Sequence, residues 1–286
     1  MSVVTSNVTS SETGFKAFIK RNQLISMYVL MFGMAWSVLM PQALYSQGLL
    51  SVPLPAFLQI LIGWAPGIAA VAVTAIVAGR AGVGDLLKRF LVWRVGAQWY
   101  LIALFLLALL ILGGIGLNVL FGGAMPMIPA AGAPFWKIAL AFLLFVVLGF
   151  LINTEEIAWR GFALPRLQSR YNVLIACVFL AIPEVALHLP LFWLKDNPFY
   201  QTVGLFWFSA FSVALVFIYA YIFNKTNASL LIVTILHASQ NAWANLLSDN
   251  TARPFQFTVA LAWMIAIALI FFTKGQLGYE SKSLDK

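Results

Sequence analysis

Residues 99–121 read WYLIALFLLALLILGGIGLNVLF, an apolar run without a charged side chain. A helix needs about 20 mostly apolar residues to cross the hydrocarbon layer of a bilayer, so this run is long enough to span a membrane. Seven further stretches share its character, at 24–46, 55–79, 135–154, 172–194, 203–223, 228–247 and 254–273. The sequence therefore predicts an all-α fold, a polytopic transmembrane helical bundle of about eight spans.

The composition excludes a water-soluble fold. Hydrophobic residues make up 62% of the 286-residue chain and charged residues only 9%, whereas an average soluble domain is roughly half apolar and a quarter charged. The net charge of +8 comes from basic residues scattered between apolar runs, so membrane lipids are expected as partners and nucleic acid is not. The single cysteine, Cys177, lies in an apolar segment and is interpreted as a small buried side chain.

The basic residues predict the orientation of the chain. If the N-terminus is cytoplasmic, only Lys137, Lys195 and Arg253 of the seventeen Lys and Arg residues fall on the far side, which leaves fourteen on the cytoplasmic side. Cytoplasmic loops of membrane proteins are enriched in Lys and Arg. Both termini are therefore expected to be cytoplasmic, in the plasma membrane if the host is prokaryotic.

The chain is expected to form one membrane domain between two short tails. The N-terminal tail covers 1–23, the transmembrane domain 24–273 and the C-terminal tail 274–286. Within the domain, the stretch from Arg80 to Trp99 combines basic and aromatic residues and predicts an amphipathic helix at the membrane interface.

The first cluster of ionisable residues lies near the end of the fourth span. An ionisable group at membrane depth costs at least ~2.5 kcal/mol on insertion scales, so such groups are expected to be functional or paired. Glu155, Glu156 and Arg160 are spaced E-E-x-x-x-R. On a helix, Glu156 and Arg160 are one turn apart and can form an ion pair, while Glu155 points roughly 100° away. A plain ion pair at a helix end is the alternative interpretation.

Two further clusters contain the only histidines of the chain. Glu184 and His188 are four residues apart in the fifth span, and His237 and Asn241 are four residues apart in the seventh. Each pair therefore shares one face of its helix. Histidine used twice, both times inside the bilayer, indicates chemistry more than packing. The alternatives are a structural pair of Glu184 with His188, and His237 with Asn241 as interhelical hydrogen-bond partners.

These clusters form one site only if they lie at a similar depth. A fourth helix that ended near Ile152 would leave Glu155 at the cytoplasmic surface, ~24 Å from His188 at 1.5 Å per residue. The sequence GFALPRLQSRY that follows contains no strong helix stop before Pro165. We therefore expect the helix to continue to about Arg166, which places Glu155 ~16 Å inside its cytoplasmic end.

These residue types fit the hydrolysis of an amide. A carboxylate and a neutral imidazole can share a water molecule, take its proton and return that proton to the leaving amine. A second imidazole and a carboxamide can donate hydrogen bonds to the developing oxyanion. Two histidines and a glutamate are also a possible zinc site.

The three clusters resemble those of the CAAX protease and bacteriocin-processing (CPBP) family of intramembrane proteases, which includes the Ras-converting CAAX protease. The family pattern is EExxxR, FxxxH and HxxxN on successive core helices, and the resemblance covers roughly 55–247. It implies that Glu155 and His188 activate a water molecule, that His237 and Asn241 form an oxyanion pocket, and that Glu156 and Arg160 support them. We adopt the metal-free, glutamate-dependent interpretation, with no cofactor.

The chain departs from the family pattern at one position, because Glu184 stands where FxxxH has phenylalanine. A carboxylate paired with His188 would hold it as imidazolium and impair base catalysis; Glu184 could equally tune a different substrate pocket.

Three functions follow as hypotheses. The leading one is an intramembrane glutamic endopeptidase that cuts a membrane-tethered or lipidated, CAAX-like peptide from the cytoplasmic side. The runner-up is a protease-like membrane scaffold or binding protein that has lost activity. The third is a transporter that uses the carboxylates as a proton relay. Inverted repeats in the sequence would favour a transporter, and none is evident.

Overall fold

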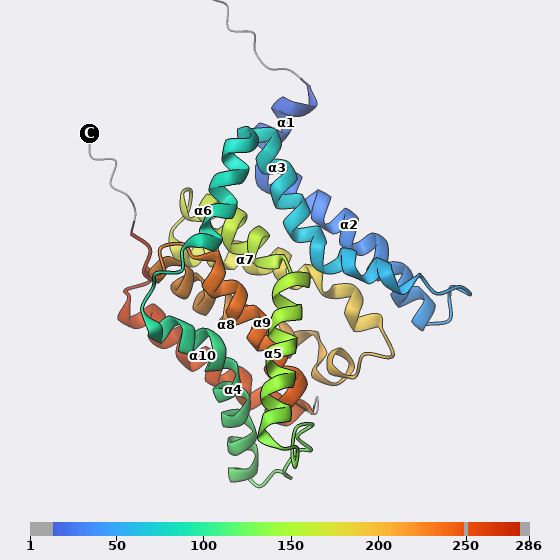
Figure 1. Cartoon of the computed structure of the whole chain (residues 1–286). Coiled ribbons are helices and arrows are strands. Elements are labelled where there is room, and N and C mark those ends of the chain that lie inside the picture. The colour runs from blue at the N-terminus through green and yellow to red at the C-terminus, as the bar shows by residue number, and fades with distance from the viewer. Residues whose placement is uncertain (1–13, 249–250, 281–286) are drawn as a thin grey trace, which may run out of the picture.

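The computed structural model describes residues 14–248 and 251–280, and over these ranges the chain is helical, with no strand (Figure 1). Each of the eight predicted spans is confirmed as a helix. The long helices are α2 (Gln23–Ser46), α3 (Gln59–Leu87), α4 (Ala97–Leu120), α5 (Phe135–Ile152), α7 (Val173–Leu187), α8 (Pro198–Lys225), α9 (Leu230–Leu247) and α10 (Ala252–Phe272). The short elements are α1 (Phe15–Arg21), η1 (Ala56–Leu58), η2 (Lys88–Leu91), η3 (Ile157–Ala163), α6 (Leu164–Gln168) and η4 (Leu189–Trp193).

Seven helical segments of the described chain are long and apolar enough to cross a membrane. They are built on all the long helices except α9, whose second half carries the polar residues His237, Gln240, Asn241 and Asn245. α9 packs against α4, α5 and α8, and these four side chains line a cavity between the helices.

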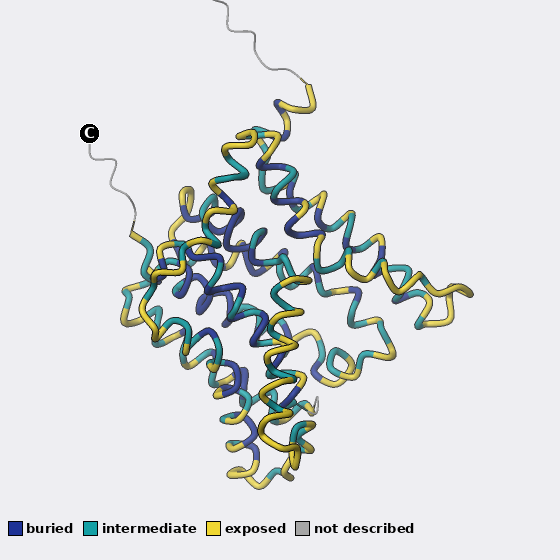
Figure 2. The backbone as a smooth tube through the Cα atoms, viewed as in Figure 1, coloured by how far each residue is buried: buried dark blue, intermediate teal, exposed yellow. Residues whose placement is uncertain are grey.

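The core lies where α7, α8 and α9 meet the short helices η3 and α6. Buried residues gather there, while yellow, exposed positions line the outer faces of the bundle (Figure 2). Cys177 is fully buried in this core, as predicted. The exposed residues on the outer faces are largely apolar, as expected where the surrounding solvent is lipid.

The helices form two groups that diverge from the core. α2 and α3 pack against each other on one side, and α4 packs against α9 and α10 on the other, with α5 against α9 (Figure 1). No residue of α5 is buried. α5 is therefore a wall between the interior and the lipid.

Two segments differ from the prediction. The expected N-terminal tail contains α1, while residues 1–13 of it, and 281–286 of the C-terminal tail, lie outside the described residues. The expected interfacial helix begins as a continuation of α3 beyond a kink at Gly79, whose φ of 64° lies in the region that glycine adopts readily. Its helical part then ends with η2 at Leu91.

The prediction of one straight fourth helix to about Arg166 is wrong. α5 ends at Ile152, Asn153 has extended backbone angles, and the chain then resumes as a π-helix, η3, followed by α6. Glu155 therefore lies at a break between helices. Breaks and π-helical turns of this kind occur frequently at functional sites.

Candidate active site

The break after α5 is held in place by Thr154, which inserts into the hydrogen-bond ladder of α3. The Thr154 N–H and hydroxyl both donate to the Gly63 carbonyl, at 2.9 and 2.8 Å, and the Gly67 N–H donates to the Thr154 hydroxyl at 2.9 Å. The two glycines make room for this contact, since a Cβ on Gly63 would lie 2.6 Å from the Ile152 carbonyl oxygen and one on Gly67 would lie 2.5 Å from the Thr154 hydroxyl. α3 thus fixes where the next residue, Glu155, stands.

The Glu155 carboxylate is oriented by two donors. Trp159 Nε1 donates to Oε2 at 3.0 Å, and Asn153 Nδ2 donates to Oε1 at 3.2 Å. The backbone N–H of Glu155 in turn donates to the Asn153 side-chain oxygen at 2.9 Å. Each carboxylate oxygen can accept a further hydrogen bond, and Glu155 lines the interior cavity.

Glu156 turns the other way and pairs with Arg160, as predicted. One guanidinium nitrogen, Nη1, lies 3.2 Å from Glu156 Oε1 and 3.2 Å from Glu184 Oε2, and the guanidinium carbon lies 4.5 Å from the centre of the Tyr219 ring. Arg160 is 1% exposed. Its Nε and Nη2 have no hydrogen-bond partner among the described residues, so two carboxylates and an aromatic face compensate the buried charge.

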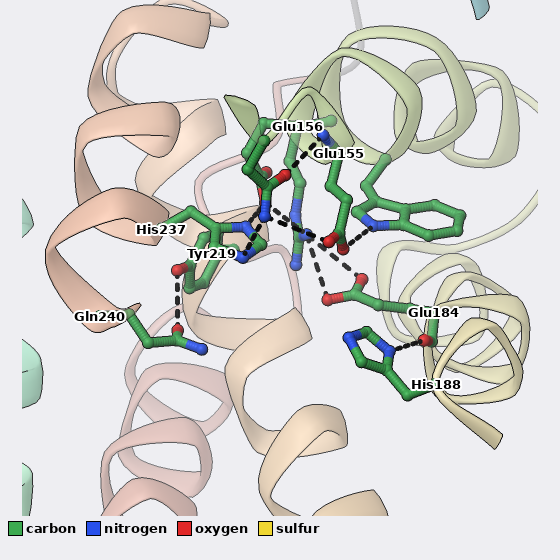
Figure 3. A network of polar contacts seen from close by, with 10 residues as sticks. Glu155, Glu156, Glu184, His188, Tyr219, His237 and Gln240 are labelled. Atoms are coloured by element: carbon green, nitrogen blue, oxygen red, sulfur yellow. Dashed lines mark hydrogen bonds and ion pairs between the residues drawn. The ribbon is translucent and has the colours of Figure 1, made fainter. Parts of the chain in front are cut away.

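His237 contacts Glu156 directly and is linked to Glu155 through the side chain of Asn153 (Figure 3). Nδ1 lies 2.9 Å from Glu156 Oε1, and Nε2 lies 3.1 Å from the Asn153 side-chain nitrogen. A carboxylate only accepts and an amide NH₂ only donates, so these partners select the tautomer with the proton on Nδ1. In this state Nε2 accepts a hydrogen bond, and the expectation that His237 donates to an oxyanion is not supported by the geometry.

His188 is oriented by the backbone of its own helix. Nδ1 lies 2.9 Å from the Glu184 carbonyl oxygen, which can only accept a hydrogen bond, so in a neutral ring Nδ1 carries the proton and Nε2 the free lone pair. The ring lies 5.0 Å from that of Phe208, between ring centres, and lines the cavity. This arrangement leaves His188 able to act as a base.

The expected pairing of the Glu184 carboxylate with His188 is contradicted by the contacts. The carboxylate reaches Arg160 instead, and only the backbone carbonyl of Glu184 meets the imidazole (Figure 3). The physical reason is the buried guanidinium, which attracts a carboxylate more strongly than a neutral ring. The argument that Glu184 holds His188 as imidazolium therefore loses its basis.

Asn241 lies apart from this network. It lines the cavity and is exposed there, and among the described residues its carboxamide makes no side-chain hydrogen bond. Its neighbour Gln240 is fixed instead, since the Tyr219 hydroxyl donates to Gln240 Oε1 at 2.9 Å. The Gln240 NH₂ group is thus available as a donor beside His237 (Figure 3).

Four residues of this site were not predicted from the sequence. Asn153 and Gln240 adjoin the recognised clusters, so their positions carried a usable signal. Trp159 lies within the first motif, at a position that the pattern leaves open. Tyr219 is one of several aromatic residues in α8, and its sequence position alone carries no such signal.

All three clusters line one cavity of about 830 Å³. Apolar side chains of α4 and α5 form much of its wall, including Leu107, Ile111, Phe145 and Leu148. The polar groups lie together at one part of this wall. A cavity of this size can take an extended peptide segment with an apolar attachment, within the range of ordinary ligand sites.

The polar groups do not gather as metal ligands. Across residues 14–248 and 251–280, no three His, Cys, Asp or Glu side chains are grouped so as to hold a metal ion. Both ring nitrogens of His237 already face protein groups. The zinc interpretation of Glu155, His188 and His237 therefore does not fit this arrangement.

We expect Asn153→Ala to lower the rate of the peptide hydrolysis that the sequence predicts by about 10- to 100-fold, the usual effect of losing a supporting contact. The substitution removes the only bridge between Glu155 and His237 among the described contacts, while the backbone bonds of Thr154 to α3 remain. The rate is measured with a quenched fluorescent peptide in proteoliposomes. Asn245→Ala, on α9 at the cavity wall, is the matched control, and an equal loss in both variants would contradict a specific role for Asn153.

Comparison with known proteins finds a match over the segment that carries this site. A family model described as type II CAAX prenyl endopeptidase Rce1-like matches residues 133–243, the segment from just before α5 into α9 that holds all three clusters. Over this segment the chain is therefore similar to the CAAX prenyl endopeptidases that the family model describes. The resemblance recognised from the sequence motifs is thereby confirmed over this segment, and the seven apolar helical segments indicate an integral membrane protein.

One curated relative of this chain is a protein named CAAX prenyl protease 2, from Methanococcus maripaludis. The two are 26% identical over 175 residues, which is 59% of this chain and 64% of the relative. The chain thus spans just under two-thirds of the relative's length.

Proposed function

We propose that this protein is an intramembrane endopeptidase that hydrolyses a peptide bond of a membrane-associated substrate with water activated by Glu155 and His188. One observation carries the proposal. The Glu155 carboxylate and the imidazole of His188 line the same cavity, and each is held by protein donors or acceptors that leave a lone pair free.

The reaction follows from these free lone pairs. A water molecule between Glu155 and His188 loses one proton to this pair as its oxygen attacks the carbonyl carbon of the substrate, which forms the new C–O bond. The tetrahedral intermediate collapses when the C–N bond breaks. The same pair then returns the proton to the leaving nitrogen, so the products are a carboxylic acid and an amine.

The oxyanion needs donors that are already oriented, because such groups cost no reorganisation during the reaction. His237 is an acceptor at Nε2 in the tautomer that its partners select. We assign the donor role to the carboxamides of Gln240, oriented by Tyr219, and Asn241, which faces the cavity. His237 then acts as a positioning residue for Asn153 and, through it, for Glu155.

Glu156, Arg160 and Glu184 support the site without contact to the reacting atoms. Arg160 compensates two buried carboxylates, and Glu156 in turn fixes the proton of His237. This arrangement gives Glu184 a supporting role within an active enzyme. The scaffold hypothesis, which rested on Glu184 impairing His188, has no contact in its favour.

The substrate class follows from the family and the cavity wall. The relative's name specifies a prenyl protease, and apolar side chains of α4 and α5 line the cavity beside the polar groups. We propose a peptide that is anchored in the membrane by an attached lipid or an apolar segment, so that its cleavable bond is presented at the depth of Glu155. No metal takes part in the proposed reaction.

The test is cleavage of a lipidated reporter peptide by purified protein in proteoliposomes. We expect His188→Ala to lower the rate by about 10²- to 10⁴-fold, the usual contribution of a general base, and chelators to leave the wild-type rate unchanged. Glu184→Phe is run beside it, and we expect it to keep most of the activity if its fold is retained. Equal rates for wild type and His188→Ala would contradict the endopeptidase and favour a binding protein.

A further inference from the structure

The two ends of the bundle differ sharply in charge. The end that we call the basic end joins the N-terminal parts of α2 and α7, the end of α3, and the junctions after η3, α8 and α10. Four contacts define it: Arg166 with Gln23, Arg89 with the Gly161 carbonyl, Ser229 with the Val92 carbonyl, and Asn224 with the Leu277 carbonyl. The basic side chains in its loops and helix ends include Arg80, Lys88, Arg89, Arg94, Arg166, Arg170, Lys225 and Lys274.

The opposite end, the rim end, carries few charges. It joins the end of α2 to the chain after η4 through Ser46 and the Trp193 carbonyl, and the loop before α5 to α9 through the Ala130 N–H and the Leu246 carbonyl. Lys137, Lys195 and Arg253 are its basic residues.

The cavity lies toward the rim end. On α4 its lining residues fall between Leu107 and Ile115, in the later part of a helix that runs from the basic end to the rim end. The loop residues that line it, Pro129 and Asn197, belong to the rim end. Toward the basic end the interior is instead closely packed, since Trp159, Phe162 and Leu164 are 0% exposed.

We infer that the substrate reaches Glu155 from the non-cytoplasmic side of the membrane. Lys and Arg at helix ends are retained on the cytoplasmic side, and the anionic lipids of the cytoplasmic leaflet attract basic residues next to the membrane. The basic end is then cytoplasmic, and the cavity opens at the other face. That the molecule entering the cavity is a substrate rests on the proposed function. The inference replaces the expectation of cleavage from the cytoplasmic side.

The substrate class is narrowed accordingly. It is a peptide anchored in the outer leaflet, or crossing the membrane, whose cleavable bond enters the cavity from the non-cytoplasmic surface and reaches the depth of Glu155. A prenylated protein tail that is exposed only to the cytoplasm would not reach the cavity mouth.

Single-cysteine labelling tests the inference without reference to activity. In the full-length chain with Cys177→Ala, we introduce Asp196→Cys at the rim end, Asn245→Cys at the cavity wall and Ser169→Cys at the basic end; all three positions are exposed. Spheroplasts are treated with a membrane-impermeant maleimide before or after permeabilisation. We expect Asp196→Cys and Asn245→Cys to label equally in both conditions, and Ser169→Cys to label only after permeabilisation.

Two results would overturn the inference. Labelling of Asn245→Cys only after permeabilisation would show that the cavity opens to the cytoplasm, and labelling of Ser169→Cys in intact spheroplasts would show that the whole chain is inverted. A protein that labels as expected but cleaves no reporter would contradict the endopeptidase proposal, and leave the direction of the cavity standing.

Discussion

Glu155→Gln is expected to lower the rate of peptide cleavage by about 10²- to 10⁴-fold, because the carboxamide cannot take a proton from water. The fold should be retained, since the glutamine oxygen can still accept from Trp159 or Asn153 and the neighbouring Thr154 keeps its bonds to α3. The rate is measured under single-turnover conditions in proteoliposomes, and thermal unfolding in detergent is recorded beside it.

Asp85→Asn is the matched control for this variant. It makes the same chemical change at a carboxylate that is 71% exposed and pairs with Lys88 at the basic end. We expect it to match wild type in rate and unfolding temperature. A Glu155→Gln protein that is folded and cleaves at the wild-type rate would remove Glu155 from the mechanism.

Arg160→Met is expected to lower the free energy of unfolding by about 3–5 kcal/mol, the usual effect of removing one partner from a buried ion pair. Methionine fills much of the space but leaves the carboxylates of Glu156 and Glu184 without their cation. Thermal unfolding in detergent and the yield of monodisperse protein report the loss.

A second substitution separates lost charge from lost packing. Adding Glu184→Gln to Arg160→Met removes one of the two uncompensated carboxylates with little change in shape, so part of the lost stability should return. The surface variant Arg253→Met is the control, expected within about 0.5 kcal/mol of wild type. If Arg160→Met unfolds at the wild-type temperature, the buried guanidinium has no structural role.

The sequence was sufficient for the helices and for the grouping of the site residues. Hydropathy located each span, because a helix in lipid must satisfy its own backbone and cover it with apolar side chains. The i,i+4 spacing also predicted the contact between Glu156 and Arg160, which the structure confirms.

The local geometry at the site could not be predicted in this way. The break at Asn153 depends on Thr154 bonding to α3, a contact between residues far apart in the chain. The partner of Glu184 was wrongly expected to be His188, because spacing along one helix says nothing of a guanidinium that arrives from another. The tautomer of His237 likewise depends on Asn153 and Glu156, which only the folded chain brings to its two sides.

The insertion of Thr154 between Gly63 and Gly67 has a consequence for which substitutions in α3 the proposed active site can tolerate. The ladder of α3 is open at this point, and Thr154 completes it. α3 supplies no acid, base or oxyanion donor, yet through Thr154 it fixes the position of the Glu155 carboxylate. A substitution at Gly63 or Gly67 would therefore shift Glu155 and change the rate of the proposed reaction, although neither glycine contacts a reacting atom.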